Sequence, residues 1–144
     1  MKPEEVQKLS DNVLRCSVHN LIYPTDIAEY DEGGFIRCSG MNGEEAFAPL
    51  SAIEDYPQDL NAMHEAVVSL SELDRARFWL NVARVILVGY VDRRVAQCHF
   101  EEIAEATARQ RAEAFVLTMQ GRAEARTPVA ARATESCAMR KAYG

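Results

Sequence analysis

Apolar residues recur at helical spacing in two stretches of the chain, residues 56–67 and residues 106–115. In the first stretch, this spacing places on one helix face the side chains of Leu60, Met63, Val67 and Leu70. Asp59 precedes this face and can accept the free backbone amides of the first turn. The pattern therefore predicts an amphipathic helix over residues 59–70, with His64 at the edge of its apolar face.

The second stretch opens with Thr107 and Gln110, which have the T-x-x-Q spacing of a capping box. In this motif each side chain bonds the backbone amide of the other residue, so a helix begins there. Its buried face is predicted to consist of Ala112, Phe115, Val116 and Met119. Gly121 is typical of a helix C-terminus, and we expect the helix to end at that residue.

Two further helices follow from the same spacing. Residues 3–16 carry a stripe of apolar positions after Pro3, which suits a first helical turn. Ser71 and Asp74 mark the start of another helix, which we expect to end near Gly89. Residues 85–91 are rich in β-branched side chains and also fit a strand, so both interpretations stay open there.

Short apolar runs between turn signals predict the strands, at residues 21–23, 35–38 and 46–48. An alternation of side chains predicts one more strand over residues 95–100. Helices at both ends with short strands between them indicate an α+β fold, a small and mainly antiparallel sheet covered by helices. We expect one domain over residues 1–120, followed by an Ala- and Arg-rich tail over residues 121–144 that is disordered or docked on a partner.

The composition changes this picture little. A chain of 144 residues fits one domain, and it shows neither an N-terminal apolar run nor a stretch of ~20 apolar residues that could cross a membrane. We therefore expect a cytoplasmic protein without a membrane partner. The four cysteines are widely spaced and are predicted to be reduced, buried thiols.

The net charge of −6 is unevenly distributed. Residues 1–65 contain 13 acidic and 4 basic residues, whereas residues 66–144 contain 9 acidic and 12 basic residues. The two halves can face each other across the fold or across a homo-oligomer interface. Alternatively, the acidic surface engages a basic host protein, or the basic C-terminal part engages nucleic acid.

Candidate chemistry is sparse. His64 has Asp59 and Glu65 nearby, but a cap and a solvated helix position explain both carboxylates, so no catalytic residue is predicted. Cys16 with His19, and Cys98 with His99, do not form the paired spacing of a structural zinc site. The glycine-containing turns lack the spacing of a phosphate loop. We expect no enzyme activity, no metal and no cofactor.

Arg109 and Arg111 lie at the start of the 107–121 helix, where free amides and the helix dipole favour an anion. Together with Tyr90 and His64 they are the candidate ligand-binding residues. The alternative is a solvated face on which these arginines pair with Glu105 and Glu113. Other arginines could contact phosphates, but interleaved glutamates and the lack of helix-turn-helix spacing disfavour DNA and RNA as partners.

The pair of motifs YPQDLNAMHEA (residues 56–66) and ATARQRAEAF (residues 106–115) resembles the phage ABA sandwich domain, a family of small phage and prophage proteins. The resemblance covers residues 56–119. It implies an α/β/α sandwich in a phage-encoded protein, and it implies no general activity. The residues before 50 and after 120 do not match.

The leading hypothesis is a non-enzymatic phage accessory protein that binds a host protein, in its concrete form an inhibitor of a host defence system. A second hypothesis is a sponge that sequesters a nucleotide-like signal through Arg109, Arg111 and Tyr90. A structural or oligomeric phage protein and a small hydrolase that uses His64 are the remaining alternatives.

Overall fold

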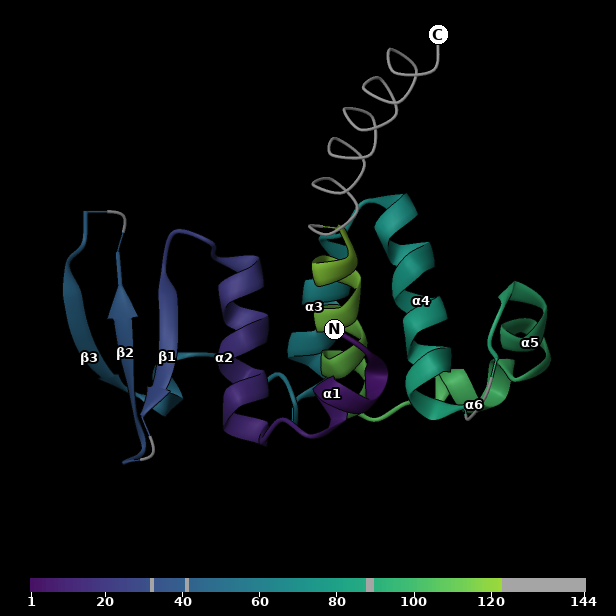
Figure 1. Cartoon of the computed structure of the whole chain (residues 1–144), viewed down its shortest axis with the longest axis horizontal. Coiled ribbons are helices and arrows are strands. Elements are labelled where there is room, and N and C mark those ends of the chain that lie inside the picture. The colour runs from purple at the N-terminus through teal and green to yellow at the C-terminus, as the bar shows by residue number, and fades with distance from the viewer. Residues whose placement is uncertain (32, 41, 88–89, 123–144) are drawn as a thin grey trace, which may run out of the picture.

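Three antiparallel strands lie at one end of the molecule, and the helices follow one another along its long axis (Figure 1). This computed structural model describes residues 1–31, 33–40, 42–87 and 90–122. Its antiparallel sheet and its helices confirm the predicted α+β class. In these ranges no helix has the length and apolar content needed to cross a membrane.

The elements are bounded as follows. The helices are α1 (Pro3–Gln7), α2 (Asp11–Ile22), η1 (Leu50–Ala52), α3 (Leu60–Val68), α4 (Glu72–Ile86), α5 (Arg93–Cys98) and α6 (Phe100–Ala104). A further helix, here called the C-terminal helix, runs over residues 108–122. The strands are β1 (Ile27–Asp31), β2 (Phe35–Ser39) and β3 (Glu45–Pro49).

The sheet is a meander in the order β1-β2-β3. Its register pairs Ala28 with Cys38 and Ile36 with Ala48. The backbone φ of Gly34 is +89° and that of Gly43 is +74°, values that favour glycine, and these residues close the two hairpins. The strands predicted at residues 35–38 and 46–48 are thus confirmed. The first is longer than predicted by one residue and the second by two.

Helix α2 packs along β1 at one side of the sheet (Figure 1). A small core between them contains Cys16, Ala28, Ile36 and Ile53. Alternate strand residues point to the opposite, outer face, where Phe35 and Phe47 are exposed. A full α/β/α sandwich would require a second helical layer over this outer face. The described residues do not form one.

A larger core joins the helices to one another. Its fully buried side chains include Leu14, Met63, Phe78 and Phe115, which come from α2, α3, α4 and the C-terminal helix. Within this core Asn81 Nδ2 donates to Thr118 Oγ1 at 3.0 Å, so the polar groups at the α4 contact are satisfied.

The predicted caps are confirmed. The Asp59 carboxylate accepts from the amides of residues 61 and 62, and Ser71 Oγ accepts from the amide of Asp74. Thr107 and Gln110 form the reciprocal capping box, with N···O distances of 2.9 and 3.2 Å. Each of these helices therefore begins where a local side chain satisfies its free amides.

Two N-terminal predictions were wrong. The helix predicted over residues 3–16 is divided into α1 and α2, because Ser10 starts a new helix by accepting from the amide of Val13 at 3.3 Å. Residues 21–23 lie at the end of α2 rather than in a strand, and the first strand begins at Ile27.

The strand predicted over residues 95–100 was also wrong, because the chain there forms α5 and α6. Asp92 caps α5 by accepting from the amide of Val95 at 2.9 Å. This capping bond gives residues 93–98 a helical start that the alternation of side chains did not indicate.

The C-terminal end also departs from expectation. Helical structure continues through Gly121 to residue 122, so the predicted stop at this glycine was wrong. Helix α4 ends at Ile86, which confirms a helix for the first part of residues 85–91. Gly89 and residues 123–144, including most of the predicted tail, lie outside the described residues.

Candidate functional site

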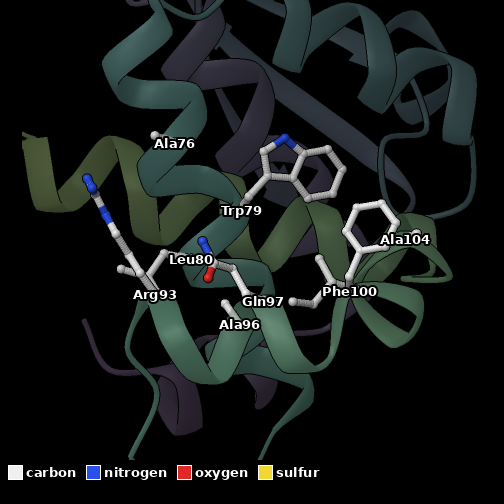
Figure 2. Close-up of a pocket in the computed structure, with 9 residues that line it drawn as sticks. Ala76, Trp79, Leu80, Arg93, Ala96, Gln97, Phe100 and Ala104 are labelled. Carbon is white, nitrogen blue, oxygen red and sulfur yellow. The ribbon is translucent and has the colours of Figure 1, made fainter.

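A groove lies between α4 and the pair α5 and α6 (Figure 2). These helices are at the end of the molecule away from the sheet (Figure 1). We call this groove the α4–α6 groove. Its volume is about 520 Å³. From α4 it is lined by Ala76, Trp79 and Leu80, and from α5 and α6 by Arg93, Ala96, Gln97, Phe100, Ile103 and Ala104.

The groove exists because neighbouring residues of α4 point to different sides. Phe78 is fully buried in the helical core, whereas Trp79 is 38% exposed and faces the groove. Ala76 lies about one turn before both Trp79 and Leu80, and the three side chains line the groove from α4. On the opposite wall the small side chain of Ala96 leaves room between α4 and α5.

The indole of Trp79 is held from two sides. The Phe78 ring lies at a centroid distance of 5.0 Å, at an interplanar angle of 71°. The guanidinium carbon of Arg111 lies 5.5 Å from the indole centroid, in a cation–π contact. The same guanidinium group donates to the carbonyl oxygens of Ala104 and Ala106 at 3.0 and 3.1 Å. These contacts fix the wall of the groove before any ligand binds.

Phe100 is the other large aromatic group of the groove and is 71% exposed. Figure 2 shows the guanidinium group of Arg93 at the end of the groove away from Phe100. Among the lining residues only Arg93 and Gln97 have polar side chains, and none is an acid, a histidine or a nucleophile. The arrangement is suited to binding an apolar group beside a negative charge, and it offers no acid–base chemistry.

Arg109, predicted to bind an anion, is engaged within its own chain. Its Nε lies 2.9 Å from a carboxylate oxygen of Glu113, and its Nη1 pairs with Asp11. Its Nη2 donates to the carbonyl oxygens of Gln7 and Leu9, at 3.2 and 2.6 Å. Arg109 therefore ties the C-terminal helix to the junction between α1 and α2.

Glu113 is the buried member of this cluster. Its side chain is 5% exposed, and burial raises the pKa of its carboxyl group, while the charge and the hydrogen bond of Arg109 act in the opposite direction. The predicted pairing of Arg109 with Glu113 is thus present, on a buried rather than a solvated face.

The structure does not assemble the four predicted ligand-binding residues into one site. Arg111 supports Trp79, and Tyr90 is 83% exposed beside a second cavity that Gln7 and Val85 also line. His64 lies on the exposed side of α3. Across the described residues, no hydrogen bond, ion pair or ring contact joins any two of Arg109, Arg111, Tyr90 and His64.

The predicted burial of the cysteine thiols is confirmed at Cys16 and wrong at Cys98, which is exposed. Cys16 is buried under the sheet, and burial raises the pKa of its thiol. His19 Nε2 lies 3.3 Å from a carboxylate oxygen of Asp26. Within the described ranges, no three residues among histidine, cysteine, aspartate and glutamate are placed to hold a metal ion.

The α4–α6 groove itself was not predicted from the sequence. Phe100 was assigned to the strand predicted over residues 95–100. The available signal was the N-cap at Asp92, which would have converted the apolar positions of residues 95–100 into helix positions facing α4.

Comparisons of the chain with protein-family models, with curated proteins and with solved structures found no match.

Proposed function

We propose that this chain is a non-enzymatic protein that binds an apolar helix of a partner protein in the α4–α6 groove. In its specific form, the proposal is that the chain is a phage-encoded accessory protein of the host cytoplasm, and that the partner is a host defence protein which it inhibits. The observation that carries the proposal is the open, apolar groove with a fixed indole wall.

The groove matches an amphipathic helix. Trp79 and Phe100 provide two exposed aromatic surfaces, the kind of residue that dominates binding energy at protein interfaces. A partner helix that places apolar side chains one turn apart would cover both, as in other helix-in-groove complexes. Arg93 at one end favours an acidic residue on the partner beside the apolar anchors.

The groove also favours a protein ligand over an anionic small molecule. The guanidinium groups of Arg109 and Arg111, which the sponge hypothesis requires for an anion, donate to carbonyl and carboxylate oxygens of their own chain. An anion at those groups would have to displace these bonds. No comparable bond of the described chain closes the α4–α6 groove.

The test uses Trp79, the single tryptophan of the chain, as a reporter within the groove. A tagged chain is used to isolate partners from host-type lysate at physiological salt, and each identified partner is purified and titrated while indole emission is followed. We expect a saturable change in emission. Phe100→Ala should weaken binding about tenfold or more, because truncation of a central aromatic anchor costs ~1.4 kcal/mol or more.

Leu73→Ala is the matched control, because Leu73 is 58% exposed on α4 and does not line the groove. The Leu73→Ala chain should bind the partner with the same affinity as the unmodified chain. Binding that is insensitive to Phe100→Ala and leaves indole emission unchanged would place the partner elsewhere and overturn the assignment of the groove.

A further inference from the structure

Among the described residues, no group pairs with the backbone at the outward edge of β3. The amide of Gly40 donates to the carbonyl of Glu44 at 3.0 Å, and the amide of Leu50 donates to the carbonyl of Gly34 at 3.4 Å. Both bonds join residues that lie opposite each other in the same register as Ile36 and Ala48. Because hydrogen-bonded pairs alternate along an antiparallel ladder, the even-numbered residues of β3 bond β2. The backbone groups of residues 45, 47 and 49 therefore point away from the sheet.

The opposite edge of the sheet is already covered. Asn20 of α2 donates from Nδ2 to the carbonyl of Ala28 at 2.9 Å, and its Oδ1 accepts from the amide of Ala28 at 2.6 Å. A side-chain amide thus occupies the place of a neighbouring strand at β1. In the part of the chain that the structure describes, β3 receives no equivalent cover.

The side chains beside the open edge are apolar. Phe47 is 70% exposed on the outer face, and Phe35 on the adjacent strand is 53% exposed. Natural edge strands are usually protected by lysines, bulges or prolines. Strand β3 has no lysine and no bulge, its only charge is Glu45 at the first position, and its only proline is Pro49 at the last.

We propose that β3 pairs antiparallel with β3 of a second copy of this chain, with the twofold axis at Phe47. In this register each Phe47 exchanges two backbone hydrogen bonds with Phe47 of the second copy. The amide of Glu45 donates to the carbonyl of Pro49 of the second copy, and the reverse bond forms symmetrically. The result is a continuous antiparallel sheet of six strands, in which all five residues of β3 are matched.

The register explains why the occupant is a second copy. In this register Pro49 of each copy lies opposite Glu45 of the other. Because proline has no backbone N–H, one hydrogen bond is missing at each end of the interface and none is missing at its centre. Ala46 lies opposite Ala48 of the second copy on the inner face, where small side chains leave the joined sheet free of clashes. A register centred on Glu45 would instead bring two carboxylates together and cover less of the strand.

The test measures the mass of the full-length chain in solution by light scattering and native mass spectrometry over a range of concentrations. We expect a dimer. Phe47→Lys should give a monomer, because two ammonium groups would face each other at the axis. Circular dichroism should show that this variant keeps its fold, since the replaced side chain is exposed.

Glu45→Pro separates strand pairing from simple contact between aromatic faces. The amide of residue 45 points outward, so proline removes two of the four intermolecular bonds and none within the sheet. The dimer dissociation constant should rise about tenfold, as expected for the loss of ~1.4 kcal/mol. Leu73→Lys, at an exposed apolar position of α4, is the matched control and should remain dimeric.

Three results would overturn the proposal. One is an unmodified chain that stays monomeric up to about 100 µM, where even a small interface of this kind should pair. Another is a dimer that survives Phe47→Lys, since its interface would then lie elsewhere. The last is a folded Glu45→Pro variant with unchanged dimer affinity, which would exclude pairing through the β3 edge.

Discussion

Arg109 shows how a single residue can hold distant parts of the chain together. Its guanidinium group contacts Asp11 and Leu9, which precede it by about a hundred positions, as well as Glu113 on its own helix. The local pairing with Glu113 was foreseeable because i and i+4 residues of a helix are neighbours. The contacts with the α1–α2 junction depend on tertiary packing, and no local pattern in the sequence contains them.

Replacement of Arg109 by alanine should lower the free energy of unfolding by about 2 kcal/mol, because it leaves the buried Glu113 carboxylate without its partner. Arg109→Lys should lower the free energy of unfolding by less, since lysine keeps the positive charge. It should still cause some loss, because lysine cannot reach all four acceptors. Urea denaturation followed by circular dichroism measures both. Arg75→Ala, at an exposed position of α4, is the control and should be neutral. Equal losses at the two arginines would show that the cluster does not stabilise the fold.

Glu113 should make stability depend on pH. Burial raises the pKa of its carboxyl group in the folded state above the ordinary value of 4.5, so folding favours the protonated form. Its contribution to stability is complete below pH 4.5 and is lost as pH rises through the folded-state pKa. The stability advantage of the native chain over Glu113→Gln should therefore shrink from pH 4 towards neutrality. Denaturation curves of both proteins across this range test it, and an advantage that grows with pH would contradict it.

At the scale of single elements, the sequence was informative at several helix starts whose decisive partner lay within three or four residues, but the equally local caps at Ser10 and Asp92 were missed. Asp59, Ser71 and the pair Thr107 and Gln110 cap helices through such local bonds, and their helix starts were predicted correctly. The hairpin strands were found because glycine-containing turns bracket them. Strands and helices were confused over residues 95–100, where both periods fit a run of only six residues.

The Asn20 bridge between α2 and β1 is an element-scale contact with a measurable effect. Asn20→Ala should lower the free energy of unfolding by about 1–2 kcal/mol, because the amide and carbonyl of Ala28 lose their partners in a partly buried place. Hydrogen exchange at the Ala28 amide should accelerate at the same time. Asn61→Ala, on the exposed side of α3, is the control for general effects of removing an asparagine. Unchanged exchange at Ala28 would show that the bridge does not protect this edge.

For the whole molecule, the α+β class followed from the order of helical and strand-like segments, and the structure bears it out. The candidate site did not follow, because the α4–α6 groove arises from the packing of two short helices against α4. Trp79 and Phe78 are neighbours in sequence, and only their packing decides that one faces the core and the other the groove. Phage origin, a host partner and the absence of enzyme activity stay predictions.

The opposite placement of the sheet and the α4–α6 groove along the molecule has a consequence for assembly (Figure 1). Two chains joined through β3 would carry their grooves at the far ends of the pair, so the pair could engage two partner molecules at once. Against a partner that is itself oligomeric, this bivalence would yield an avidity above the affinity of one groove, by a factor of about 10² or more. Chains held as monomers would keep the affinity of each groove but lose the avidity of the pair.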